Sequence, residues 1–315
     1  MVTSPCSSNG FLFTLGSQGP DMTQFTLKAG RELEIFDNEV ASSEALVFHH
    51  GTPSDATVWK SWLEYAASSG TRALAYSRAG YGQSARRVDR SVASVTDDLK
   101  EVLDSKGIGH FVGIGWSGGG PHALAGTLDR RCRGAIILAG VAQYGAPDLD
   151  FLDGMGPENH DEFGAALKGE GVLARWMEQN AIGLQTISGD QLREAFGGLV
   201  GPADKEVLHG AYAEDLAGVM RRALSLGFAG WIDDDLAFVK DWGFRLGEIA
   251  VPVRIWQGDQ DLMVPLSHAR WLAKEVPKAE LSFVPGQGHI SLVVSYRDQV
   301  LDQARELLYA APSAA

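Results

Sequence analysis

A serine set among small residues is the strongest chemical signal in the sequence. Gly115-Trp116-Ser117-Gly118-Gly119 follows an apolar, β-prone run and precedes a helix-compatible stretch. A nucleophile at a sharp strand-to-helix turn needs glycine neighbours, because a side chain there would collide with the tightly folded backbone. Such a turn also points the hydroxyl toward free N–H groups at the start of the helix. The pattern predicts that Ser117 is a nucleophile, although a glycine-rich connection without chemistry has the same five letters.

Two later loops supply the partners that a nucleophilic serine requires. Its hydroxyl is protonated at neutral pH, and an imidazole with a pKa near about 6.5 can accept that proton. Asp261 follows one predicted strand, and His289 follows the next. Loops at the carboxyl ends of strands are where open α/β sheets build their sites. The order Ser117, Asp261, His289 predicts a nucleophile, acid and base triad. Asp259 is a second candidate for the acid, and Asp261 would then cap a helix.

A third loop, His49-His50-Gly51-Thr52-Pro53, follows another predicted strand. Acyl transfer creates a negative oxygen, and each backbone donor that binds it stabilises the transition state by about 3 to 4 kcal/mol. The N–H groups of Thr52 and Gly118 are predicted to form this oxyanion hole. His50 is predicted to brace the loop rather than to act as a second base.

Short β-rich runs alternate with helical patterns, which predicts an α/β fold with an eight-stranded, mostly parallel sheet. The predicted strands are Gln24 to Lys28, Glu32 to Phe36, Ala45 to His49, Arg72 to Tyr76, His110 to Ile114, Gly134 to Ala139, Val253 to Gln257 and Glu280 to Val284. The predicted helices between them are Val58 to Ser68, Val92 to Ser105, Pro121 to Asp129, Leu266 to Val276 and Ile290 to Tyr309. Ala29-Gly30 is predicted to join the first two strands as a hairpin.

The alternation stops for about a hundred residues, which carry helical periodicity and no strand pattern. We expect a helical cap at 142–246, inserted into a core formed by 22–141 and 247–315. Residues 1–21 are rich in Ser, Gly and Pro, and a flexible extension is expected there. Between residues 145 and 245 the sequence has 18 Asp or Glu and 8 Lys or Arg, so much of the net negative charge falls on the cap.

Composition excludes several classes of function. The chain has 45% hydrophobic and 21% charged residues, which is typical of a globular protein with a sizeable core. A formal net charge of −13 would repel phosphate backbones and anionic lipid, so neither nucleic acid nor a membrane surface is an expected partner. Two cysteines, Cys6 and Cys132, form no disulfide framework, and no secretory signal is recognisable, so a cytoplasmic location is expected. The sequence predicts no oligomeric state.

The sequence resembles the capped α/β-hydrolase superfamily from Met22 to Ala310. His50-Gly51-Thr52-Pro53 is similar to its oxyanion segment, Gly258 to Pro265 to its acid loop, and Gly286 to His289 to its G-x-G-H ending. The resemblance implies the α/β-hydrolase fold with an inserted helical cap, and catalysis without cofactor or metal. It also opposes epoxide hydrolase and dehalogenase activities, because those relatives have Asp at the nucleophile position. One departure is Ser77, which stands where the family usually has Asp.

The expected activity is hydrolysis of an ester, lactone or related acyl bond of a small molecule through an acyl-enzyme. Trp116, Trp231 and Asp234 are predicted to line the substrate pocket. An aminopeptidase of the proline iminopeptidase type is the alternative if a cap carboxylate, from Glu178 or from Asp233 to Asp235, points inward to meet an amine. A non-catalytic ligand-binding protein of the same fold is a second alternative.

Overall fold

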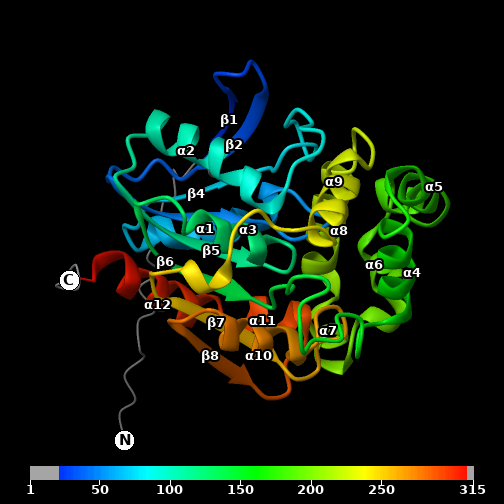
Figure 1. Cartoon of the computed structure of the whole chain (residues 1–315). Helices are drawn as coiled ribbons and strands as arrows, with labels where there is room; N and C mark the ends of the chain where they lie inside the picture. Colours follow the sequence, from blue (N-terminus) through cyan, green and yellow to red (C-terminus); the bar gives the residue numbers. More distant parts are fainter. Residues whose placement is uncertain (1–20, 311–315) are drawn as a thin grey trace, which may run out of the picture.

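The computed structural model describes residues 21–310, and its centre is one eight-stranded sheet (Figure 1). The strand order is β1-β2-β4-β3-β5-β6-β7-β8. The strands are β1 (Asp21–Thr26), β2 (Glu32–Asp37), β3 (Glu44–His49), β4 (Ala73–Tyr76), β5 (His110–Trp116), β6 (Cys132–Leu138), β7 (Val253–Gly258) and β8 (Ala279–Val284). The prediction of an eight-stranded, mostly parallel sheet is confirmed. Most of the expected extension lies outside the described residues, except that Asp21 already begins β1.

The first strands of the sheet are antiparallel and the others are parallel. β1 pairs with β2 in antiparallel register, and β2 pairs with β4 in the same way. Gly30, at a φ of +81°, makes the predicted hairpin turn between β1 and β2. From β4 onward every pairing is parallel, so the carboxyl ends of β3, β5, β7 and β8 lie at one edge. The loops predicted to carry chemistry follow these four strands.

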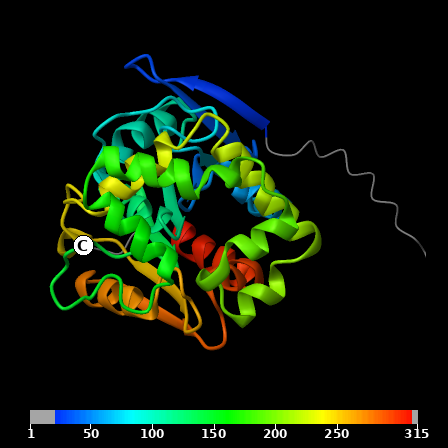
Figure 2. The ribbon, with the colours of Figure 1, turned by 90° about the vertical axis from the view of Figure 1, so that its right-hand side faces the viewer.

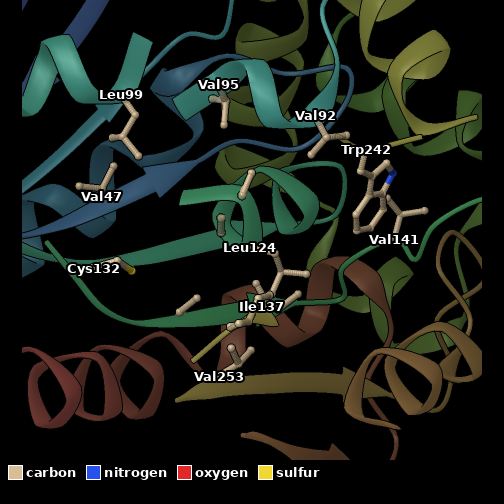
Figure 3. Packing of buried hydrophobic residues seen from close by; sticks show 14 of the residues in the cluster. Val47, Val92, Val95, Leu99, Leu124, Cys132, Ile137, Val141, Trp242 and Val253 are labelled. Atoms are coloured by element: carbon tan, nitrogen blue, oxygen red, sulfur yellow. The ribbon is translucent and has the colours of Figure 1, made fainter. Parts of the chain in front are cut away.

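Helices cover both faces of the sheet, and the strands divide their side chains between two cores. Along β3, Val47 packs in one core and Phe48 in the other; along β6, Ile137 and Ile136 do the same. This alternation is that of strands buried on both faces. One core, part of which is drawn in Figure 3, joins α2 (Val95–Ser105), α3 (Gly119–Gly126) and α10 (Leu266–Glu275) to the sheet, and the other joins α1 (Lys60–Ser68) and α12 (Arg297–Tyr309). Short 3₁₀ helices span Ala56–Trp59, Val92–Ser94 and Leu246–Glu248.

The segment between β6 and β7, here called the helical insertion (residues 139–252), contains α-helices and 3₁₀ helices and no strand of the sheet. Its helices are α4 (Pro157–Ala166), α5 (Glu170–Asn180), α6 (Gly189–Ala195), α7 (Pro202–Val207), α8 (Gly210–Ala223) and α9 (Ala229–Phe238), with 3₁₀ helices at Ile182–Gln185 and Gly197–Leu199. Most of them lie together at one side of the sheet, which faces the viewer in Figure 2. A third, smaller core includes Leu173, Met177 and Leu224 of the insertion together with Tyr81 from outside it. The division of the chain into core and cap at 141/142 and 246/247 stays a prediction.

Two differences between the predicted helices and the structure bear on the site. The stretch expected to be one helix from Ile290 to Tyr309 forms two, α11 (His289–Ser295) and α12, which meet at Tyr296. The six-residue helix α7 was not expected, because so short a segment shows no hydrophobic periodicity. Both differences concern the site, since α7 packs against the start of α11. In the described part of the chain, no helix is long and apolar enough to cross a lipid bilayer.

Candidate active site

Ser117 lies at the sharp turn between β5 and α3. Its φ is +56°, a left-handed conformation that a residue with a side chain rarely adopts. A Cβ at Gly115 would lie 2.2 Å from the carbonyl oxygen of Gly119, and one at Gly119 would lie 2.1 Å from that of His49. Neither position has room for a side chain. The elbow therefore needs its glycines for the mechanical reason that the sequence predicts.

His289 begins α11, and its ring is bonded to the acid predicted for it. Its Nδ1 lies 2.8 Å from Oδ2 of Asp261. The other oxygen of Asp261 accepts hydrogen bonds from the backbone N–H groups of Met263 and Val264, at 3.0 and 2.8 Å. Asp259 is exposed and accepts a hydrogen bond from the N–H of Gly286, 2.7 Å away. Asp261 is thus the carboxylate that meets the imidazole, and Asp259 braces the loop that leads to it.

The residue before the serine also holds the imidazole. The Trp116 ring centroid lies 5.3 Å from that of His289, and Trp116 Nε1 donates to the His289 carbonyl oxygen at 3.2 Å. Ser117 and His289 line the same cavity. Within the described part of the chain, no hydrogen bond joins the serine hydroxyl to the ring. In enzymes without substrate this contact is often long and tightens in the bound complex.

The predicted oxyanion donors are neighbours. A Cβ at Gly118 would lie 2.4 Å from Oγ1 of Thr52, so only glycine allows the two loops to approach so closely. Among the described residues, no acceptor receives a hydrogen bond from the N–H of Thr52 or of Gly118, and both residues line the cavity. Two free donors beside the serine are what a developing negative oxygen requires.

His50 has the bracing contacts predicted for it. Its Nδ1 lies 2.8 Å from the carbonyl oxygen of Gly51, and its Nε2 accepts a hydrogen bond from the backbone N–H of Arg78 at 3.0 Å. These contacts fix a neutral ring with its proton on Nδ1. Burial, followed by the charge of Arg78, holds the pKa of His50 well below its usual value. Both ring nitrogens are occupied, so His50 has none free to act as a base.

The pKa of His289 is raised above its usual value, in contrast to that of His50. Burial alone would lower the pKa of His289, but the charge of Asp261, the hydrogen bond to it and the charge of Asp204 outweigh burial and raise it. A higher pKa means a stronger base once the ring is neutral. The surroundings of His289 therefore favour the acceptance of a proton.

Asp204, on α7 of the helical insertion, holds the backbone of His289. Its Oδ2 accepts from the N–H of His289 at 2.9 Å, and its Oδ1 accepts from those of Ile290 and Ser291 at 2.9 and 2.8 Å. The side chain is fully buried. Three free N–H groups at the start of a helix favour an anion, so one carboxylate satisfies the start of α11. Sequence reasoning missed Asp204, because no local pattern links it to a histidine 85 residues later.

The cavity above the serine has a volume of about 380 Å³ and lies between the sheet loops and the helical insertion. Trp116 and Trp231, both predicted for the pocket, line it. The third predicted residue, Asp234, does not line it, and its neighbour Asp235 does. Glu178, the other cap carboxylate considered, is exposed and lies away from the lining.

Asp234 is instead the centre of a buried cluster, here called the Asp234 cluster. Its carboxylate accepts hydrogen bonds from Arg78 and from Thr52 Oγ1, at 2.6 Å each, and from the Tyr81 hydroxyl at 3.0 Å. The carboxylate also lies 2.6 Å from the guanidinium of Arg90 and 3.3 Å from Nε2 of His122. The charges of Arg78 and Arg90 outweigh burial and hold the pKa of Asp234 well below its usual value. Through Thr52, this cluster connects α9 to the oxyanion loop.

Ser77, the one departure from the motifs described above, meets a glutamate from another strand. Ser77 Oγ donates to Oε2 of Glu34, on β2, at 2.8 Å and accepts from the N–H of Ala56 at 3.1 Å. Glu34 is fully buried and forms an ion pair with Arg222 of α8. Ser77 is thus bonded directly to the buried carboxylate of Glu34. Only the fold reveals this contact, because the two residues are 43 positions apart in the sequence.

Among the described residues, no group of three or more His, Cys, Asp or Glu side chains is arranged to hold a metal ion. The site consists of a serine, an imidazole, a carboxylate and two free backbone donors. Such a set can perform nucleophilic acyl transfer.

Comparisons with known proteins agree with this architecture. The sequence model of the Alpha/beta hydrolase family matches residues 46–303. A protein of Caballeronia sordidicola named epoxide hydrolase is 32% identical over 120 residues, which are 35% of this chain and 36% of that protein. A putative carbamate hydrolase from a Caulobacter species is 25% identical over 265 residues, 81% of this chain and 87% of the relative. A thermophilic esterase from Thermogutta terrifontis superposes with a TM-score of 0.67 at 18% identity, over 91% of this chain and 99% of the esterase, which shows a shared fold.

Proposed function

The chain belongs to the alpha/beta hydrolase family, and from that premise we propose that it is a serine hydrolase that cleaves an ester, lactone or related acyl bond of a small molecule. Ser117 is the nucleophile, His289 the base and Asp261 the acid that orients it. The observation that carries the proposal is the 2.8 Å contact between His289 and Asp261, beside a cavity that Ser117 also lines.

In the first half of the reaction, the Ser117 oxygen attacks the substrate carbonyl carbon while its proton moves to Nε2 of His289. Asp261 accepts from Nδ1–H, which leaves Nε2 with a lone pair and stabilises the charged ring. The carbonyl oxygen becomes negative and accepts from the N–H groups of Thr52 and Gly118. His289 then returns the proton to the leaving group, the bond to that group breaks, and an acyl-enzyme remains.

In the second half, water replaces the alcohol or amine that has left. His289 takes a proton from the water, whose oxygen attacks the acyl carbon and re-forms the negative oxygen in the same hole. The bond to Ser117 breaks, and its oxygen recovers the proton from His289. The products are the carboxylic acid and the regenerated serine.

Hydrolysis of 4-nitrophenyl butyrate tests the triad. Ser117→Ala and His289→Ala are each expected to lower kcat by about 10⁴-fold or more, because members of a triad act as one unit. A fluorophosphonate probe is expected to label the wild type at Ser117 and not Ser117→Ala. A folded Ser117→Ala variant that keeps wild-type turnover would sink the proposal. A folded wild type that neither turns over esters nor reacts with the probe would favour the ligand-binding alternative.

The leaving group of the substrate is a separate question. Proline 4-nitroanilide, an amide with a free amine, is the substrate that distinguishes the iminopeptidase alternative from an esterase. Faster turnover of this amide than of 4-nitrophenyl butyrate would replace the esterase proposal by the peptidase and leave the triad intact.

A further inference from the structure

Carboxylic side chains dominate the ionisable lining of the cavity above Ser117. Four carboxylic residues line it, Glu158, Asp161, Glu162 and Asp235, and no Lys or Arg is among the described residues of the lining. Its apolar wall includes the aromatic side chains of Trp176 and Trp231. A low-dielectric cavity with charge of one sign concentrates ligands of the opposite sign.

Two of these carboxyl groups, one of them fully buried in the wall, adjoin each other. Asp235, on α9, is 1% exposed, and its Oδ2 is fully buried with no hydrogen-bond donor among the described residues. Glu162, on α4, is partly exposed and lies within hydrogen-bonding reach of Asp235. Besides its hydrogen bond with Asp235, Glu162 receives one donor, Nε1 of Trp231, at 2.6 Å. The pair therefore has far fewer donors than two carboxylates can use.

The nearby arginines do not fill this deficit. Arg78 and Arg90 bond to Asp234, on the side of α9 that faces the sheet loops. Burial, followed by the charge and the hydrogen bond of Glu162, raises the pKa of Asp235 well above its usual value. Burial also raises the pKa of Glu162, against the hydrogen bonds from Asp235 and Trp231. A buried carboxyl oxygen without a donor, such as Oδ2 of Asp235, is costly. At a cavity wall this cost is expected where a ligand supplies the missing partner.

We infer that Glu162 and Asp235 form a subsite for a protonated primary or secondary amine, so that the substrate of Ser117 is an acyl compound bearing an ammonium group. An ammonium group brings both the positive charge and the N–H donors that the pair lacks. Trp176 and Trp231, which also line the cavity, are of the residue type that attracts such a cation most strongly. The claim that Ser117 cleaves this substrate rests on the proposed function. The claim that the pair binds an amine does not.

Matched substrates test the subsite. 4-Nitrophenyl alaninate and 4-nitrophenyl isobutyrate differ by one ammonium group in place of a methyl near the carbonyl, and 4-nitrophenyl 6-aminohexanoate and heptanoate differ in the same way at the far end of the chain. In at least one pair, the wild type is expected to show a kcat/KM about tenfold or more higher for the ammonium ester. Preference for the neutral ester in both pairs overturns the inference.

Variants locate the preference. Glu162→Gln with Asp235→Asn is expected to reduce the ratio within a pair to about one while the enzyme still hydrolyses the neutral ester. Asp233→Asn is the matched control: it makes the same chemical change on the same helix, at a carboxylate that pairs with Arg86 outside the cavity. If the double variant unfolds, Glu162→Gln alone replaces it and is expected to lower the ratio severalfold. An unchanged ratio in a folded variant contradicts the inference.

Binding separates this inference from the proposed reaction. Ser117→Ala, titrated calorimetrically with hexylammonium and with hexanol, is expected to bind the ammonium compound about tenfold more tightly or better. That result would stand even if Ser117 were found not to be the nucleophile. Equal binding of the two compounds would overturn the subsite even if the triad were established.

Discussion

Asp234 and Asp235 are neighbours on α9 and are both buried, yet they have opposite surroundings. Asp234 meets two arginines, a tyrosine, a threonine and a histidine, and its pKa is held well below the usual value. Asp235 meets another carboxylate, and its pKa is raised well above the usual value. Burial opposes the charge of both side chains, so the supply of partners decides which of them stays charged.

The two sides of α9 accordingly do different things. The Asp234 cluster binds the helical insertion to the core, because Arg78 and Thr52 belong to loops of the sheet. The Asp235–Glu162 pair lies between two helices of the insertion and faces the cavity. In this protein, a buried carboxylate with a full set of partners indicates an anchor, and a buried carboxyl group that lacks donors indicates a binding surface.

The largest effect is expected from Asp234→Ala, which breaks the anchor. It leaves Arg78 and Arg90 buried without their partner, and breaking a buried pair in this way costs about 3 to 5 kcal/mol of unfolding free energy. Turnover should also fall, because Thr52 loses the acceptor of its hydroxyl. Urea unfolding at neutral pH measures the loss. Asp233→Asn, whose partner Arg86 is partly exposed, is the control and is expected to cost about 1 kcal/mol or less. Equal effects of the two variants would show that Asp234 is no anchor.

Asp204 is a second anchor, and its removal is expected to act on His289. Asp204→Ala leaves three N–H groups at the start of α11 without an acceptor, and the loss of a helix cap costs about 1 to 2 kcal/mol. The charge of Asp204 helps to raise the pKa of His289, so without it the acid limb of the kcat/KM profile should move to lower pH.

Asp204→Asn separates the two roles of Asp204. The amide oxygen keeps a cap for α11 while the negative charge is lost, so the acid limb should move and kcat should fall less than in Asp204→Ala. The measurement is a pH profile of 4-nitrophenyl butyrate hydrolysis for both variants. A limb that stays at the wild-type pH in both would mean that Asp204 does not influence the imidazole.

The sequence predicted the loops that carry the proposed triad and missed these anchors for a physical reason. Ser117, Asp261 and His289 each lie in the connection that follows a strand, so local pattern and chain order suffice to propose them. The contacts of Asp204, Glu34 and Asp234 join residues far apart in sequence, and no local rule carries that information.

Asp233, Asp234 and Asp235 show most clearly what a local sequence pattern cannot predict. They are the same residue three times in sequence, and a helix turns about 100° per residue. Their side chains therefore point to three surroundings: a partly exposed arginine, a buried cluster and the cavity. The sequence indicated that one of the three meets the substrate pocket, and the prediction of Asp234 was one residue away from the side chain that lines it.

The smallest effect, and the one that separates the two sides of α9 most sharply, is expected from Asp235→Asn. A carboxyl whose pKa is higher in the folded protein than in the unfolded chain binds more protons when folded, so it favours folding least at high pH. Asparagine lacks this dependence and can donate to Glu162. The variant is therefore expected to be more stable than the wild type by about 1 kcal/mol at pH 8, and the gain should vanish near pH 4, close to the unfolded pKa of about 3.9.

Urea unfolding at the two pH values, with Asp233→Asn measured alongside, gives the difference. A variant less stable than the wild type at pH 8 would mean that Asp235 is charged and satisfied, as Asp234 is, and the two sides of α9 would then not differ.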